Sequence, residues 1–420
     1  MKLALNRRRR SKSANGAKRR SMSVQRIRFR MGVLPFLGGD AADDEDLSLS
    51  ISQGAAAELA RVRWLDVIPP GALMQRPAPV GASDATQSHD LDYIVDGAVS
   101  CDGKRLQVSV RLVDLTEYAR TLWSERFVLP VGELREANEL IASRILGAID
   151  PVVLFFDGQP KRRKRDGATG LLLRAIPLIY SMERQKHEKA GLLINQALEA
   201  EPDNPTAAAW AAFWQVLYFG QGWTQDLATA SGIAQEHSRR AMSLSQDDPE
   251  TLIICGHVSS FLSRDYDKAL YYFDRAQRLG SSLPFTWAWS ALTYCYVGKP
   301  SVALERLKHC SHLAPIDCCF SWSQNIHAVT YTFAGDYEKS VALSRRVTQR
   351  NPNFTNGYKP LVASLGHLGR RDEARPYVEK LLALEPGFTV ERFGQVYPIK
   401  YESDRERYMT GLRLAGVPER

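Results

Sequence analysis

Residues 251–386 contain four related segments: Arg264-Asp-Tyr-Asp-Lys-Ala269, Gly298-Lys-Pro-Ser-Val-Ala303, Gly335-Asp-Tyr-Glu-Lys-Ser340 and Gly369-Arg-Arg-Asp-Glu-Ala374. Their first residues are 34, 37 and 34 positions apart. A period near 34 residues is typical of helical hairpins that stack into a solenoid. This stretch therefore predicts an all-α repeat array.

Small and large residues follow one order within each unit, which resembles the tetratricopeptide (TPR) pattern. The small residues let two helices approach closely, the large ones fill the groove of the next hairpin, and a proline ends the second helix. We expect these TPR packing residues to be Ala269, Phe273, Ala276, Trp287, Ala291, Tyr294, Gly298, Ala303, Leu307, Pro315, Tyr331, Gly335, Pro352, Gly369, Ala374 and Pro386.

Length and composition are those of a protein with two or three domains. The chain has 420 residues, 44% of them hydrophobic, and no apolar run of the roughly 18 to 20 residues that a membrane span needs. The basic start lacks the apolar core of a signal peptide, so we expect a cytoplasmic protein. Six cysteines without a CxxC pair predict reduced thiols.

The net charge of +8 is concentrated in two segments. Residues 1–30 carry twelve Lys and Arg and no acid, and Lys161-Arg-Arg-Lys-Arg165 adds five more, which leaves the remainder near −9. Residues 1–25 are expected to be a disordered basic tail. Residues 1–30 could bind nucleic acid without sequence preference through phosphate neutralisation, or could be a solvated linker.

Residues 26–156 predict a small α/β domain. Hydrophobic residues alternate from Ile27 to Val33 and from Leu106 to Leu112, with an Asp-Gly hairpin turn before the second run. Strands are also expected at 64–68, 93–100 and 121–127. An acidic loop at 40–46 leads to a helix with its apolar stripe from Leu47 to Val62, and a second helix is expected at 131–149.

Several phrases in this domain carry a resemblance to a known family. They are Val33-Leu-Pro-Phe36, Arg61-Val-Arg-Trp-Leu-Asp-Val-Ile68, Tyr93-Ile-Val-Asp-Gly-Ala-Val99, Leu122-Trp-Ser-Glu-Arg126 and the ending Gly411-Leu-Arg-Leu-Ala-Gly-Val-Pro-Glu419. Together they resemble the TolB-amino-terminal-like domain of bacterial signalling regulators. That resemblance implies a domain between an amino-terminal effector, either a winged-helix or a class III adenylate cyclase domain, and carboxy-terminal TPR repeats. Neither effector domain is found in this sequence.

The rest of the chain divides into a linker, an array and a cap. A basic linker is expected at 157–168, about six helical hairpins at 169–390, and capping helices at 391–420 that cover the last apolar face. The expected fold class is α+β: a small α/β sandwich followed by an all-α solenoid. First-helix residues line the concave face of such arrays, so Gln324 and Tyr358 are candidates to face a protein or peptide partner.

Motifs for catalysis, metal or cofactor binding are missing from the sequence. It has no phosphate loop, HExxH, GxSxG or paired cyclase aspartates. The cluster His309-Cys-Ser-His312 with Cys318-Cys319 contains zinc-binding residue types, but its spacing fits helix packing better. We therefore predict a non-enzymatic signalling or transcription-regulator protein with a protein-binding TPR scaffold. The alternative is the detached regulatory half of a class III adenylate cyclase, encoded separately or cut from its catalytic domain by a misassigned start.

Overall fold

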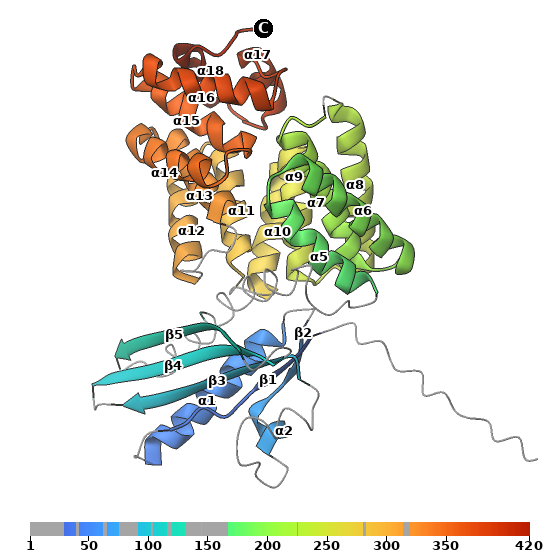
Figure 1. Ribbon diagram of the computed structural model, residues 1–420, viewed down its shortest axis with the longest axis vertical. Coiled ribbons are helices and arrows are strands. Elements are labelled where there is room, and N and C mark those ends of the chain that lie inside the picture. Colours follow the sequence, from blue (N-terminus) through green and yellow to red (C-terminus); the bar gives the residue numbers. More distant parts are fainter. Residues whose placement is uncertain are drawn as a thin grey trace, which may run out of the picture.

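The computed structural model describes residues 29–38, 42–61, 65–74, 91–101, 104–115, 120–130, 144, 167–224, 226–279, 283–313 and 320–420. In this part of the chain a small sheet and an array of helices form two separate bodies (Figure 1). The fold therefore combines a five-stranded sheet with TPR-like helical repeats, in agreement with the predicted fold class.

The sheet is built from strands whose hydrophobic residues alternate. Its elements in chain order are β1 (Phe29–Val33), α1 (Ala42–Leu59), β2 (Leu65–Ile68), α2 (Pro70–Met74), β3 (Tyr93–Cys101), β4 (Arg105–Asp114) and β5 (Arg120–Pro130). The strand order is β2-β1-β3-β4-β5; β1 runs parallel to β2 and β3, and the other pairs are antiparallel.

The sheet core agrees with the alternation in the sequence. Phe29, Met31 and Val33 are buried on β1, and every second residue of β4 from Leu106 to Leu112 is buried. One expectation was wrong: α1 already begins at Ala42, so most of the expected acidic loop is helical, as carboxylates near a helix N-terminus favour. The expected helix at 131–149 lies outside the described residues, except for Arg144.

Twelve described helices form six consecutive hairpins. They are α5 (Ala168–Tyr180), α6 (Arg184–Ala200), α7 (Pro205–Gly220), α8 (Leu227–Leu244), α9 (Pro249–Phe261), α10 (Tyr266–Leu279), α11 (Pro284–Tyr296), α12 (Pro300–Leu313), α13 (Phe320–Ala334), α14 (Tyr337–Arg350), α15 (Thr355–His367) and α16 (Arg371–Leu384). The first helices of neighbouring hairpins pack side by side, which is the arrangement of a TPR-like solenoid.

The turns explain the period that is visible in the sequence. Gly298, Gly335 and Gly369 have positive φ angles of 69°, 80° and 70°, and Arg264 takes the same conformation with φ 55°. A left-handed residue is a common way to end a helix before a tight turn, and glycine adopts it without a steric penalty. Each of the four repeated segments therefore starts at the residue that reverses the chain.

The end of the chain does not continue the array. After α16, the helices α17 (Val390–Val396) and α18 (Glu402–Ala415) turn back, and α18 packs against α15, α16 and α13. We call residues 390–415 the return segment. In the described part of the protein no helix is both long and apolar enough to span a membrane.

Candidate functional site

The first helices α9, α11, α13 and α15 form an inner groove in which the return segment lies. The Tyr266 hydroxyl donates to the Pro398 carbonyl over 2.8 Å, and the Lys400 amide donates to the Tyr296 carbonyl over 2.9 Å. Further along, the Arg407 guanidinium donates to the Phe333 carbonyl over 3.0 Å. The first two bonds use the main chain of the return segment, as the bonds of a bound peptide often do, and the third uses its Arg407 side chain.

Helix α18 approaches α15 through two glycines. A Cβ atom on Gly411 would lie 2.5 Å from the Ala363 carbonyl oxygen, and one on Gly366 would lie 2.9 Å from the Ala415 amide nitrogen. Real Cβ atoms do not tolerate such distances, so both positions require glycine at this helix spacing. The inner groove therefore receives a helix at close range.

Aromatic side chains fill the inner side of the array beside the return segment. The Phe213 ring stacks on Trp289 at a centroid distance of 4.6 Å, His257 lies 5.0 Å from Trp289, and Trp322 lies 6.2 Å from Phe354. These rings come from α7, α9, α11, α13 and the start of α15. The contact between Phe213 and Trp289 joins the second hairpin to the fourth, so the superhelix of the array has a tight turn.

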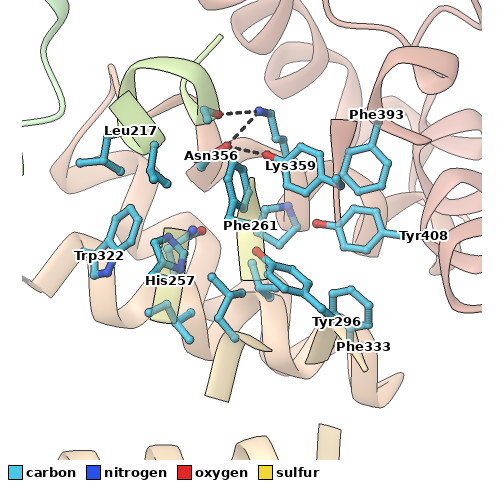
Figure 2. Close-up of a pocket in the computed structure, with 18 residues that line it drawn as sticks. Leu217, His257, Phe261, Tyr296, Trp322, Phe333, Asn356, Lys359, Phe393 and Tyr408 are labelled. Atoms are coloured by element: carbon cyan, nitrogen blue, oxygen red, sulfur yellow. Dashed lines mark hydrogen bonds between the residues drawn. The ribbon is translucent and has the colours of Figure 1, made fainter. Parts of the chain in front are cut away.

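A cavity of about 50 Å³ remains between the array and the return segment (Figure 2). Its walls are mostly aromatic and aliphatic, with a few polar groups among them. The lining residues are Val216, Leu217, Gly220, His257, Phe261, Leu292, Tyr296, Trp322, Asn325, Ile326, Val329, Phe333, Asn356, Lys359, Pro360, Phe393, Tyr397 and Tyr408.

Lys359 is the charged residue of this wall, and its ammonium group is fully partnered. Its Nζ lies 2.9 Å from Asn356 Oδ1 and 3.3 Å from the Gly220 carbonyl oxygen, and Figure 2 shows both bonds. It also forms an ion pair of 3.0 Å with Glu385, a buried side chain that follows α16. Burial lowers the pKa of Lys359, and Glu385 opposes that shift. The pair leaves the wall without net charge.

The other polar groups of the wall are uncharged. Burial lowers the pKa of His257 to about 3, so its imidazole is neutral at pH 7. Burial raises the pKa of Tyr296 and Tyr408 well above 10, so both keep their hydroxyl protons. In Figure 2 the two hydroxyl groups point into the cavity. The cavity can donate and accept hydrogen bonds but offers no ion binding.

The residues of zinc-binding type seen in the sequence are not grouped in the described part of the chain. The His309 ring packs on Trp287 at 4.0 Å, whereas His312 contacts the Arg144 guanidinium at 3.5 Å. Cys318 and Cys319 lie outside the described residues, as does the basic tail, whose nucleic-acid binding stays a prediction. Within the described ranges no three His, Cys, Asp or Glu side chains are grouped to hold a metal.

The expected packing residues occupy three kinds of position. Gly298, Gly335 and Gly369 are exposed at the turns within hairpins, and Pro352 and Pro386 are exposed after the second helices α14 and α16. Pro315 lies outside the described residues. Trp287, Tyr294 and Tyr331 are half-buried, and the first two contact the Arg306 guanidinium instead of filling the core. Buried in the array are Ala269, Phe273, Ala276, Ala291, Ala303, Leu307 and Ala374.

One of the two partner-facing candidates is not available. Tyr358 is only 4% exposed, its hydroxyl donates to the Pro352 carbonyl over 3.0 Å, and its ring packs near Tyr377. Its ring faces Tyr377 on the second helix α16, whereas Lys359, the next residue on α15, lines the cavity. Gln324 is half-buried on α13, and its role stays a prediction.

Sequence reasoning missed Lys359 and Glu385. The available signal was a lysine within α15, a helix of mostly apolar and small residues, where a charge is expected to need a buried partner. The partner lies after the next helix, at a spacing that no local pattern predicts.

No protein-family model and no curated protein matches this chain. Solved structures share parts of its shape: human IFIT1 with m7Gppp-AAAA has 14% identity and a TM-score of 0.45 over 67% of each chain. PilW, a type IV pilus biogenesis factor, has 19% identity and a TM-score of 0.37 over 53% of this chain and 94% of its own. YrrB, a TPR protein with an unusual peptide-binding site, has 15% identity and a TM-score of 0.28 over 46% and 93%. None of these likenesses assigns a ligand, and the TolB-like resemblance stays a prediction.

Proposed function

We propose that this chain is a non-enzymatic scaffold of a bacterial signalling or transcription-regulatory system, which binds a segment of a partner protein in its inner groove. In this proposal the five-stranded domain acts as the sensor-like part. The observation that carries it is the return segment itself. The groove holds the stretch before α18 through hydrogen bonds to its main chain, and it holds α18 through a close glycine contact and the Arg407 side chain.

The groove has the properties of a helix-binding surface. Its floor consists of buried side chains of α13 and α15. At one end Arg264 and Tyr266 donate to main-chain carbonyls of the return segment, which every peptide presents. At the other end the Phe333 carbonyl accepts from the Arg407 side chain, so a partner with an arginine at that position would make the same bond. A partner helix with a small residue at the position of Gly411 would fit the same surface.

The reactive residue types of the array support a role without catalysis. Burial raises the pKa of the Cys255 thiol to about 11 and that of Cys295 to about 12, so neither forms a nucleophilic thiolate at neutral pH. Because the sequence also lacks a phosphate loop and the paired metal-binding aspartates of a cyclase, purified protein with ATP and a divalent metal should form no cyclic nucleotide. Turnover that a point mutation abolishes would contradict this part of the proposal.

The groove is tested by supplying the return segment in trans. In full-length Gly411→Leu protein, the larger side chain would clash with the Ala363 carbonyl and displace α18 from the groove. A labelled synthetic peptide of residues 390–420 should then bind this variant with micromolar affinity, measured by fluorescence anisotropy. The wild-type protein should not bind it, because its groove is occupied.

A matched variant separates an open groove from a damaged one. Gly366→Leu places the same bulk on the groove side of the contact, so it should displace α18 and also reject the peptide. The peptide that carries Gly411→Leu should bind neither variant. Equal peptide binding by wild type and Gly411→Leu, or binding by Gly366→Leu, would contradict the proposal.

A further inference from the structure

Two uncharged hydrogen-bonding groups of the cavity wall lack partners among the described residues. They are Nδ1 of His257 and Oδ1 of Asn325, on side chains 2% and 7% exposed. The hydroxyl groups of Tyr296 and Tyr408 point into the same cavity (Figure 2). Buried polar groups are nearly always hydrogen-bonded in proteins, because leaving them unpaired costs free energy. Two unpaired groups and two hydroxyls around one cavity therefore indicate that it holds a hydrogen-bonding molecule.

The cavity selects against ions. The positive charge of Lys359 is already balanced by Glu385 and hydrogen-bonded to Asn356 and Gly220. His257 is neutral, and the rest of the wall consists of aromatic and aliphatic side chains and the uncharged amides of Asn325 and Asn356. An added charge would lose its hydration without gaining an opposite partner.

The size of the cavity limits the occupant. A water molecule needs roughly 10 to 15 Å³ of such space, so a cavity of about 50 Å³ holds roughly three to five non-hydrogen atoms. The tyrosine hydroxyls can both donate and accept, whereas the aromatic rings favour an apolar body. We propose that the cavity binds a small uncharged molecule that carries one amide or hydroxyl group on a short apolar body.

Such a ligand would connect the array to the return segment. His257, Tyr296 and Asn325 belong to α9, α11 and α13, whereas Tyr408 belongs to α18. A molecule that bonds to both sides binds only while α18 is seated, so it stabilises the closed form by mass action. This inference stands independently of the proposed partner binding, and its test does not use the peptide.

The test compares two molecules of equal shape on the full-length protein. Propionamide has five non-hydrogen atoms and no charge, and propionate is its charged counterpart. We expect saturable one-to-one binding of propionamide in the millimolar range or tighter by titration calorimetry, with slower hydrogen exchange in α18. Propionate should show no saturable binding at the same concentrations.

Tyrosine-to-phenylalanine variants test the site, because they remove a hydroxyl and keep the ring. Tyr296→Phe and Tyr408→Phe should each weaken propionamide binding roughly fivefold. Tyr271→Phe, at a residue that is 54% exposed on α10, should leave it unchanged. The proposal is overturned if propionamide does not saturate, which would indicate a cavity that holds water only. It is also overturned if propionate binds equally or if both cavity variants bind like wild type.

Discussion

The Nζ of Lys359 lies 3.0 Å from Oε2 of Glu385, with the two side chains 2% and 7% exposed. The same ammonium group donates to the Gly220 carbonyl, 139 residues earlier in the chain. One buried ion pair thus joins α15 and the end of α16 to the end of α7. Two charges taken out of water need each other, because either one alone would be buried without compensation.

Removal of one partner should therefore cost far more than removal of both. Lys359→Met and Glu385→Leu should each lower the free energy of unfolding by about 3–5 kcal/mol, because an unpaired buried charge remains. The double variant Lys359→Met/Glu385→Leu should cost less than either single change. Urea unfolding of the three variants measures this coupling. Simple additivity would show that the two charges act independently.

An exposed ion pair provides the control. Arg239 and Glu236 pair on α8 with side chains 70% and 61% exposed. Because exposed pairs contribute little, Arg239→Met should change the unfolding free energy by less than about 1 kcal/mol.

The close contact between α15 and α18 predicts opposite effects for two glycine-to-alanine changes. Gly366→Ala would place a methyl group against the backbone of α18 and should destabilise the protein by about 1–3 kcal/mol. Gly232→Ala on α8 meets no atom within 4 Å and should stabilise it by about 0.5–1 kcal/mol, since alanine favours the helix. Thermal unfolding of both variants checks the signs. A stabilising Gly366→Ala would mean that α18 does not pack there.

Local patterns in the sequence were sufficient for the strands and for the hairpin period. Alternation on β1 and β4 and the left-handed residues at Arg264 and Gly298 follow from rules that act over a few residues. The return segment could not be predicted in this way. Gly366 and Gly411 meet across 45 residues, and an amphipathic α18 is equally compatible with a cap at the end of the array.

The candidate site depended on such distant contacts. Lys359 was hidden because Glu385 lies at the far end of its own hairpin and Gly220 lies in the second hairpin, and no period relates these positions. Tyr358 was misassigned for a related reason: a residue on a first helix faces either the groove or the second helices, and one position along the helix decides which. The cavity exists only because the return segment covers it.

Two buried histidines predict a loss of stability in acid. Burial lowers the pKa of His187 to about 4 and that of His257 to about 3, against about 6.5 in an unfolded chain. Below pH 6.5 these histidines therefore bind protons in the unfolded state but not in the folded state, and this difference favours unfolding. Each histidine should lower the unfolding free energy by up to about 1.4 kcal/mol per pH unit until its folded pKa is reached. Urea midpoints at pH 7, 6 and 5 measure the slope, which His257→Phe should reduce; an identical slope in the variant would rule out this role for His257.

The stacking of the array predicts how damage in its middle spreads. Ala303 is fully buried on α12, which packs against α11 and α13, so Ala303→Glu would force a charge into the contact between hairpins. We expect a cost of several kcal/mol and faster hydrogen exchange from α11 to α14, while the five-stranded domain keeps its protection. Val302→Glu, one residue earlier at a position 38% exposed, should change stability by no more than about 0.5 kcal/mol. If Ala303→Glu left exchange in these helices unchanged, Ala303 would not be a contact residue, and the assignment of packing roles from the repeat would be wrong.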